Sequence, residues 1–564
     1  MSRHHTRRPG QRSFTPWVIV ALVALAIGLP LCACLTVPRL VRETQARNEP
    51  VLLELAYSPE KEALLTALLR DFQTKRPRVP GGRPIVIHAT PAEPDAMIED
   101  ALAGRYQVIT PDSSIWLSQL DAERATVSED VTLGQPTLVG EVTRYAVSPV
   151  VIAMWEDVAR AIGHPAKALG WTDLLEKARS DPSFKWSHPS TSSASGLLAT
   201  LAEFYAASGK TRDLTAADAT AQATLGYVST IEKTVRHYGE GEWALIQQML
   251  QSGKSYLDAV VVQEQLVIHF NGQGRGRLVA IYPIEGTLWE DHPLVLLEQE
   301  SLTSEQRQAY AVLRDYLLSP DAQKRILEAG YRPVDLDVSL TEPGSPFTSD
   351  NGVDPLQPKT TLQMPGSAVL QIVRDVWWYT KRHTNVYLVA DVSGSMADDN
   401  KIEDARQALK IFLEQIRGDE ERVGLISFST AVSEDVPLGL LGQNRHNLDA
   451  GIDSLSADGN TALLDAISLA YQRLRALDDR ERINAIVVMT DGQENNSSIS
   501  LGELEDQVRL GNESGPAVVI FCIAYGRDAD MATLRRIAEV SGGQARSGDL
   551  DTIRQLYKML SAYF

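Results

Sequence analysis

Cysteine and histidine are scarce in this chain, whose 564 residues include three cysteines and ten histidines. The cysteines, Cys32, Cys34 and Cys522, are too few for the disulfide framework that stabilises small secreted domains. No CxxC pair and no HExxH motif provides the ligand spacing of a zinc site. A redox or zinc-dependent enzyme is therefore disfavoured.

Positive charge is also in short supply, because 54 Lys and Arg face 73 Asp and Glu and give a formal net charge of −19. Seven of the arginines and only two of the glutamates lie in residues 1–50, so the rest of the chain is still more acidic. Binding to nucleic acid or anionic lipid depends on Lys and Arg that neutralise phosphate. We therefore expect no nucleic-acid partner.

Motifs for nucleophilic catalysis and nucleotide binding are missing as well, since the sequence has no GxSxG elbow and no Walker A loop. What is present is the composition of ordinary globular domains, with 44% apolar and 23% charged residues. The chain is long enough for several hydrophobic cores. We therefore expect a folded protein that is not an enzyme.

An uncharged stretch, residues 13–38, lies near the amino terminus. Its apolar part, residues 16–37, would span about 30 Å as a helix, which matches the hydrocarbon layer of a bilayer. Four arginines precede it in a basic tail, residues 1–15, and the positive-inside rule places that tail in the cytoplasm. The Leu-Cys-Ala-Cys sequence ending at Cys34 also resembles a bacterial lipoprotein box, and this alternative stays open. Either interpretation predicts a protein held at the cell membrane, as a single-pass anchor or by a lipid, with its C-terminal domains extracytoplasmic.

Two α/β units with a boundary segment between them are predicted for the remainder. In residues 50–338, short apolar runs alternate with helical patterns, which indicates a mostly parallel sheet covered by helices. Pro, Gly, Ser and Asn become dense in residues 339–380, where a short helix is expected over 367–379. The alternation then resumes in residues 381–564. Strands are predicted there over 385–390, 423–428, 483–489 and 517–523, and helices over 404–417, 461–477, 501–510, 531–540 and 552–560.

An aspartate and two serines stand at alternate positions where the first of these strands ends, in Asp391-Val-Ser-Gly-Ser. In an extended chain, alternation aims the three side chains the same way. A second apolar strand ends in Thr-Asp-Gly at 490–492, and a threonine begins the expected helix between the two strands. A doubly wound sheet gathers such loops at the carboxyl edge of its strands. We therefore expect five side chains to lie together, namely Asp391, Ser393, Ser395, Thr461 and Asp491.

Two carboxylates and three hydroxyls suit a hard divalent cation, and the small number of carboxylates favours Mg²⁺ or Mn²⁺ over a Ca²⁺ cage. With its metal, such a site would be roughly neutral and could accept an Asp or Glu carboxylate from a partner at an open position. The metal would then be a bridge and not a catalyst. The alternative, in which these residues only order the loops and hold no ion, stays open.

The same motifs resemble the metal-ion-dependent adhesion site of von Willebrand factor A domains, over about residues 381–564. The resemblance implies a doubly wound, mostly parallel, Rossmann-like sheet. It implies direct ligation of the metal by Ser393, Ser395 and, in one or other state, Thr461, and ligation by Asp391 and Asp491 directly or through water. It also implies a protein partner that presents an Asp or Glu carboxylate, and a shift of the last helix that can accompany binding.

Several short motifs occur in order within residues 50–338. They are Trp-Thr-Asp-Leu-Leu at 171–175, a serine-rich stretch before a helix at 188–196, Ile-Tyr-Pro-Ile-Glu-Gly-Thr at 281–287 and Ser-Pro-Asp-Ala-Gln-Lys at 319–324. Together they resemble the extracytoplasmic solute-binding proteins of ABC transporters, which implies two α/β lobes hinged around a cleft.

Hydroxyls and free backbone N–H groups at a helix start can hold a small polar or anionic solute. The serine-rich stretch offers such a cradle, and Asp-Ser-Ser at 112–114 offers another after a strand. The candidate contacts are Ser113, Ser114, Ser190, Thr191, Ser192 and Ser193. Plain helix capping explains these residue types equally well. Tyr145, Gln263 and Tyr282 can line the same cleft or pack in the core.

The leading hypothesis is a membrane-tethered, extracytoplasmic binding or adhesion protein. Its metal site would bind an acidic group on a protein partner, and its cleft domain would sense or capture a solute. The alternative is the solute receptor of an ABC importer, in which the A-type domain is only a docking appendage.

Overall fold

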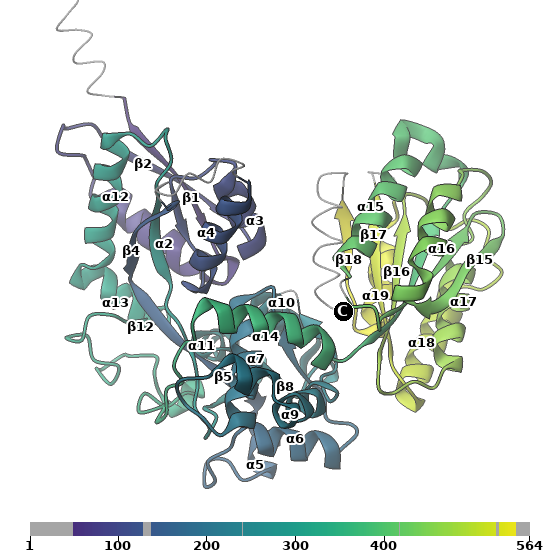
Figure 1. The fold of residues 1–564 in the computed structure, drawn as a ribbon, viewed down its shortest axis with the longest axis horizontal. Coiled ribbons are helices and arrows are strands. Elements are labelled where there is room, and N and C mark those ends of the chain that lie inside the picture. The colour runs from purple at the N-terminus through teal and green to yellow at the C-terminus, as the bar shows by residue number, and fades with distance from the viewer. Residues whose placement is uncertain (1–48, 128–136, 240, 417, 526–528, 549–564) are drawn as a thin grey trace, which may run out of the picture.

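The computed structural model describes residues 49–127, 137–239, 241–416, 418–525 and 529–548 (Figure 1). The expected basic tail 1–15, the expected membrane segment 16–37 and the expected helix 552–560 lie outside these residues. Among the helices that are described, none combines the length and the apolar character that a membrane crossing requires.

The first lobe is built on a five-stranded sheet with the order β2-β1-β3-β11-β4. Its strands are β1 (Val51–Tyr57), β2 (Ile85–Pro91), β3 (Val108–Thr110), β4 (Val139–Arg144) and β11 (Pro293–Leu297). Its helices are η1 (Pro59–Lys61), α2 (Glu62–Thr74), α3 (Pro94–Leu102), α4 (Ile115–Val127), α12 (Ser304–Leu317) and α13 (Pro320–Glu328). The apolar side chains of β1 are buried against α2, where Leu64, Leu68 and Phe72 recur at helical spacing.

The second lobe contains a seven-stranded sheet, in which β9 and β12 pair with β5 beside the path β10-β5-β8-β6-β7. Its strands are β5 (Ala146–Trp155), β6 (Trp186–Pro189), β7 (Tyr238–Gly239), β8 (Ala259–Gln263), β9 (Leu278–Ile281), β10 (Trp289–Glu290) and β12 (Arg332–Pro333). Its helices are α5 (Glu156–Ala161), α6 (Trp171–Ser180), α7 (Ala194–Ser208), α8 (Ala216–Thr220), α9 (Gln222–Glu232), α10 (Glu242–Ser252), η2 (Gly253–Ser255) and α11 (Glu264–Gly272).

Both sheets of this N-terminal domain are mixed, whereas the sequence predicted mostly parallel ones. In the first lobe, β1 is parallel to β2 and β3, but β11 is antiparallel to β3 and β4. In the second lobe, β5 is antiparallel to β8, β9, β10 and β12. The reason is that β5 and β11 carry the chain from one lobe to the other, so each enters its sheet against the direction of the local βαβ units.

The boundary segment 339–380 is packed along the second lobe. Gly352 accepts a hydrogen bond from the Ala280 backbone N–H at 2.7 Å, and Thr361 forms a β-bridge with Thr287. The segment contains η3 (Ser349–Asn351) and α14 (Ser367–Thr380), which lies along the second lobe in Figure 1. Leu362, Leu370, Val373 and Trp377 of this segment are part of the hydrophobic core of that lobe.

The C-terminal domain has a six-stranded sheet with the order β15-β14-β13-β16-β17-β18, and only the edge strand β15 is antiparallel to its neighbour. Its strands are β13 (Thr384–Asp391), β14 (Arg422–Phe428), β15 (Val432–Leu440), β16 (Ile483–Thr490), β17 (Val518–Tyr525) and β18 (Ala545–Gly548). Its helices are η4 (Gly394–Asn400), α15 (Lys401–Gln415), α16 (Leu441–Ser454), α17 (Leu463–Ala476), α18 (Leu501–Ser514) and α19 (Met531–Ser541). Every residue of β13, β16 and β17 is buried, because separate hydrophobic clusters cover the two faces of the sheet.

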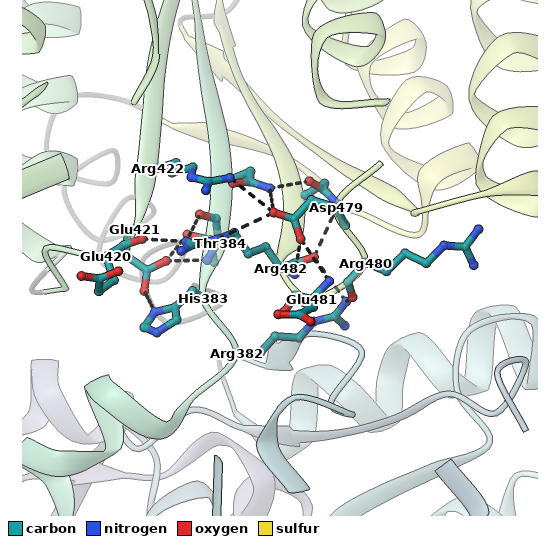
Figure 2. A network of polar contacts seen from close by, with 12 residues as sticks. Arg382, His383, Thr384, Glu420, Glu421, Arg422, Asp479, Arg480, Glu481 and Arg482 are labelled. Carbon is teal, nitrogen blue, oxygen red and sulfur yellow. Dashed lines mark hydrogen bonds and ion pairs between the residues drawn. The ribbon is translucent and has the colours of Figure 1, made fainter. Parts of the chain in front are cut away.

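The chain enters the C-terminal domain through Arg382, whose contacts reach both domains; Figure 2 shows its contacts with the residues just before β16. Its backbone N–H donates to the Tyr238 hydroxyl at 2.7 Å, and its guanidinium donates to the Val235 carbonyl at 2.7 Å, both in the second lobe. The same guanidinium donates to the carbonyls of Arg480 and Arg482, just before β16. The second lobe and the C-terminal domain are thus joined by a specific contact in addition to the covalent chain.

A buried ion pair, Lys381 with Glu421, lies at the same junction. The Lys381 ammonium is 2.8 Å from Glu421 Oε1, and neither side chain is exposed to solvent. Burial raises the pKa of Glu421, but Lys381 and the hydrogen bonds from His383 and Thr384 outweigh it and lower the pKa to about 2. The carboxylate is therefore held ionised by Lys381 and His383, which precede β13, and by Thr384, the first residue of β13.

We expect Glu421→Gln to lower the free energy of unfolding by about 3–5 kcal/mol, because Lys381 is left buried without its counter-charge. The folded pKa is about 2 and the ordinary value is 4.5, so the ionised carboxylate stabilises the wild type above about pH 4.5. This stabilisation is lost as the pH falls toward 2. Chemical denaturation at several pH values should show a steeper loss for the wild type than for the variant. Glu420→Gln, at the exposed neighbour, should match the wild type, and equal effects of the two changes would contradict the assignment.

Candidate functional site

The carboxyl edge of the C-terminal sheet brings two polar strand ends together. β13 and β16 are parallel neighbours in which Ala390 lies opposite Met489, so Asp391 at the end of β13 meets Thr490 at the end of β16. The Thr490 hydroxyl donates a hydrogen bond to Asp391 Oδ2, and the Ser393 backbone N–H donates to Asp391 Oδ1 at 2.8 Å. The loop after β13 also bonds to the loop before α17, since Gly394 N–H donates to the Gly459 carbonyl at 2.9 Å.

The hydroxyl groups predicted from the sequence lie at this edge. Ser395 Oγ donates to Asp491 Oδ1 at 2.7 Å and is 3.2 Å from Ser393 Oγ. Thr461 faces the same place, because a Cβ built on Gly492 would be 3.2 Å from Thr461 Oγ1 and 3.6 Å from Asp391 Oδ2. Three separate loops therefore contribute oxygen donors to one region.

The ammonium group of Lys401 lies at this cluster. Lys401 Nζ, from the first turn of α15, is 2.6 Å from Asp491 Oδ2, and its side chain is 13% exposed. Burial raises the pKa of Asp391; hydrogen bonds from Thr490 and Ser393 oppose this effect, and the charge of Asp491 adds to it. Two buried carboxylates and nearby hydroxyls, already in contact with an ammonium group, form a donor set that fits a hard divalent ion.

The two serine-containing stretches of the N-terminal domain approach each other from opposite lobes. Ala194, at the start of α7 in the second lobe, packs in a hydrophobic cluster of the first lobe, and its backbone N–H bonds to Asp112. The hydroxyls are engaged locally. Ser193 caps α7 by accepting from Gly196 N–H at 3.2 Å, and Ser113 Oγ accepts from Ile115 N–H at 3.4 Å. Ser190 Oγ and Ser192 Oγ bond to each other. Ser113, Ser190, Thr191 and Ser193 are buried, and the backbone N–H of Ser114 donates to Asp291 at 2.7 Å.

Four carboxyl groups lie at the same junction of the lobes, buried at Asp112, Glu242 and Glu290 and half-buried at Glu60, and the sequence drew attention only to the stretch that contains Asp112. Glu60 follows β1, Asp112 follows β3, Glu242 begins α10, and Glu290 ends β10. Burial raises the pKa of Glu290, and the nearby charges of Glu242, Asp112 and Glu60 raise it further. Burial likewise raises the pKa of Glu60 to about 8, although Lys61 lowers it. These four acids are therefore close enough to repel one another in a desolvated place.

Several polar atoms in this cluster have no hydrogen-bond partner among the residues that the structure describes. They are both carboxyl oxygens of Glu290, Oε1 of Glu60, Nδ1 of His292 and Oγ of Ser58. The other ring nitrogen of His292 contacts Gln263 Oε1 at 2.8 Å, and its backbone adopts the left-handed φ of 33°. Such strain and unpaired buried groups cost free energy, and they are typical of functional sites. Burial and the charge of Lys61 lower the pKa of His292 well below its usual value, so the ring is neutral, and the buried Lys61 ammonium balances only part of the charge of the acids.

Family comparisons agree with this division of the chain. Residues 53–332 match the family model "Bacterial extracellular solute-binding protein", and residues 385–558 match "von Willebrand factor type A domain". The chain joins a solute-binding protein domain to a von Willebrand factor type A (VWA) domain. The expected α/β two-lobed domain and the expected mostly parallel sheet of the VWA domain are confirmed. Proteins of these two kinds are typically binding proteins and not enzymes.

The alignments with three curated relatives cover less than half of this chain. "Uncharacterized protein YfbK" of Escherichia coli is 26% identical over 32% of this chain and 30% of its own length. "Inter-alpha-trypsin inhibitor heavy chain H4" of Sus scrofa is 26% identical over 42% of this chain and 24% of its own. "Uncharacterized protein Rv1836c" of Mycobacterium tuberculosis is 25% identical over 45% of this chain and 37% of its own. The chain thus spans about a quarter to two fifths of the length of these relatives.

Solved structures resemble one domain or the other. A ferric binding protein from Campylobacter jejuni is 14% identical, covers 57% of this chain and 96% of its own, and has a TM-score of 0.40. A periplasmic thiamin binding protein is 13% identical over 59% of this chain and 96% of its own, with a TM-score of 0.42. A von Willebrand factor type A protein from Catenulispora acidiphila is 20% identical over 32% of this chain and 43% of its own, with a TM-score of 0.28.

We expect Glu290→Gln to stabilise the ligand-free protein. Because the pKa of Glu290 is raised in the folded state, its ionisation costs stability as the pH rises above the ordinary value of 4.5. The variant should therefore melt at a higher temperature than the wild type at pH 8, with a smaller difference at pH 5, as measured by thermal unfolding. Glu300→Gln, at an exposed residue after β11, is the matched control and should leave the melting temperature unchanged. A lower melting temperature for Glu290→Gln at pH 8 would contradict this account.

Proposed function

We propose that the protein is a membrane-tethered, extracytoplasmic binding or adhesion protein whose VWA domain binds an acidic group on a partner protein through Mg²⁺ or Mn²⁺. The match to an extracellular solute-binding family supports the extracytoplasmic location. The observation that carries the adhesive role is the convergence of Asp391, Ser393, Ser395 and Asp491 at one sheet edge, with Thr461 adjoining.

The chemistry follows from the ligand set. Ser393, Ser395, Thr461, Asp391 and Asp491 would hold the ion, which supplies a positive charge that can accept a carboxylate from outside. The Lys401 ammonium contacts Asp491 and balances part of its charge. The chain's own task is to position these oxygens, and the bonds from Thr490 and from the Ser393 backbone fix Asp391 for it.

We expect calorimetry to detect binding of Mg²⁺ or Mn²⁺ by the wild type. Asp391→Ala/Asp491→Ala should keep the fold and lose this binding, because the changes remove both carboxylates. The same variant should lose EDTA-sensitive capture of a partner from cell-surface extract. Asp398→Ala/Asp399→Ala removes two exposed carboxylates from the neighbouring loop and is the matched control, which should keep both properties. Equal metal affinity in the wild type and Asp391→Ala/Asp491→Ala would refute the metal site.

We further propose that the cleft domain takes a small cationic solute. The sequence favoured a polar or anionic one, because Ser113, Ser114, Ser190, Thr191, Ser192 and Ser193 supply hydroxyls. Four carboxyl groups at the junction of the lobes, three of them buried, with unpaired oxygens on Glu290 and Glu60, favour positive charge instead. A bound cation would allow these acids to ionise at neutral pH and would give the unpaired oxygens a partner.

The sign of the solute can be tested with probes of matched size. We expect putrescine, choline or arginine to raise the melting temperature of the full-length protein, and sulfate, phosphate and citrate to leave it unchanged. Glu290→Gln should remove the effect, whereas Ser190→Ala should keep it. Stabilisation by an oxyanion that Ser190→Ala abolishes would instead support the hydroxyl cradle.

If Asp391→Ala/Asp491→Ala leaves the response to the solute intact but abolishes partner capture, the two domains bind separately. Retained capture would favour the importer-receptor alternative.

A further inference from the structure

A third group of buried ionisable side chains lies in the second lobe, and none of its members is among the site residues described above. It consists of His188 at the end of β6, Glu203 in α7 and Glu232 at the end of α9. None of the three is exposed to solvent. One ligand atom from each, an imidazole nitrogen and two carboxylate oxygens, lies within 4.8 Å of the other two.

Glu203 is the residue that this arrangement leaves unexplained. Within the described part of the chain, neither of its carboxyl oxygens has a hydrogen-bond partner. An ionised Glu203 would lack a donor, and a protonated one would lack an acceptor, so protonation alone does not satisfy the group. Burial raises its pKa well above the usual value, and the neighbouring charge of Glu232 adds to the effect. A positive ion between the three side chains would remove both problems.

Neighbouring groups orient His188 and Glu232 by hydrogen bonds. His188 Nδ1 lies 2.7 Å from the Pro189 carbonyl, which can only accept, so Nδ1 carries a proton and Nε2 is directed toward the glutamates. Tyr238 donates to Glu232 Oε2 at 2.6 Å, and Trp377 donates to Glu232 Oε1 at 2.9 Å. Hydrogen bonds of this kind from outside the ligand set orient metal ligands and increase their basicity.

The distance between two of the ligand atoms fits a small tetrahedral ion. His188 Nε2 and Glu232 Oε2 are 3.3 Å apart. Ligands about 2.0–2.1 Å from a tetrahedral zinc ion are separated by about 3.3–3.4 Å. One imidazole and two carboxylates suit zinc and related divalent transition ions.

We propose that His188, Glu203 and Glu232 bind one zinc-class divalent ion in the interior of the second lobe. The ion has a structural role, because the site is enclosed. It would stabilise the joint between the domains, since Trp377 belongs to α14 and the Tyr238 hydroxyl also accepts from Arg382 N–H at 2.7 Å. This proposal is independent of the metal site proposed for the VWA domain.

The test uses full-length protein that carries Asp391→Ala/Asp491→Ala, so that the VWA edge cannot contribute an ion. Elemental analysis of the purified protein should find one zinc per chain, and chelation should lower the melting temperature. Glu203→Gln, which preserves the shape of the side chain, should lower the apparent zinc affinity by at least about 100-fold. Glu242→Gln changes another buried glutamate of the same lobe and should keep the zinc.

A second measurement does not depend on whether Glu203→Gln folds. Apo protein titrated with Co²⁺ should develop visible absorption bands typical of a four- or five-coordinate site, with one equivalent bound. Absence of these bands, together with a melting temperature that zinc does not change, would overturn the proposal. Loss of the ion in Glu242→Gln but not in Glu203→Gln would also overturn it, because the ion would then lie between the lobes. A Glu203→Gln variant that is more stable and keeps its zinc would show that the two glutamates merely share a proton.

Discussion

The parallel pairing of β13 with β16 is the contact on which the C-terminal site depends. Residues 384–390 run beside 483–489 in continuous register, and all of their side chains are buried beneath helices on one face or the other. A shift by one residue would exchange the faces of every side chain in the strand. It would also separate Asp391 from Thr490. The packing of the core therefore sets the position of the polar groups at the edge. Contacts among the polar groups themselves are not needed to bring them together.

This dependence explains why the VWA domain could be predicted well from sequence. Strands buried on both faces appear as uninterrupted apolar runs, and the expected strand over 483–489 differs from β16 by one residue. The edge strand β15 was missed, because it is half-exposed and its sequence Val-Ser-Glu-Asp-Val-Pro-Leu-Gly-Leu mixes charges with Pro and Gly. The following helix α16 was missed because it contains glycine and asparagine and buries few residues. The sheet topology allowed the meeting of the two strand ends to be inferred. It did not allow the contact of Lys401 with Asp491 to be inferred, because no sequence pattern pairs a lysine at a helix start with a distant aspartate.

The junction of the two lobes was harder to predict for a different physical reason. Glu60 and Glu242 each stand at the beginning of a helix, where a carboxylate is favoured by the helix dipole and is usually solvated. They are removed from water by the approach of the two lobes, and a local sequence pattern does not reveal such an approach. The serine-rich stretch, by contrast, has a strong local signal, and much of that signal is accounted for by the capping of α7 through Ser193. Hydroxyl residues at a helix start therefore drew attention to this stretch, whereas no local pattern drew attention to Glu60, Glu242 or Glu290.

The contacts at the domain joint determine which parts of the molecule can move together. α14 is part of the core of the second lobe, and Arg382 and the Lys381–Glu421 pair attach the same lobe to the beginning of β13. A rotation of the second lobe relative to the first would therefore carry the VWA domain with it. β13 is eight residues long, so its far end at Asp391 lies about 26 Å from the joint and would move further than the joint itself. Trp377 and Tyr238 both bond to Glu232, and Tyr238 also accepts from Arg382, so the contacts that attach α14 and the start of the C-terminal domain to the second lobe meet at this buried glutamate.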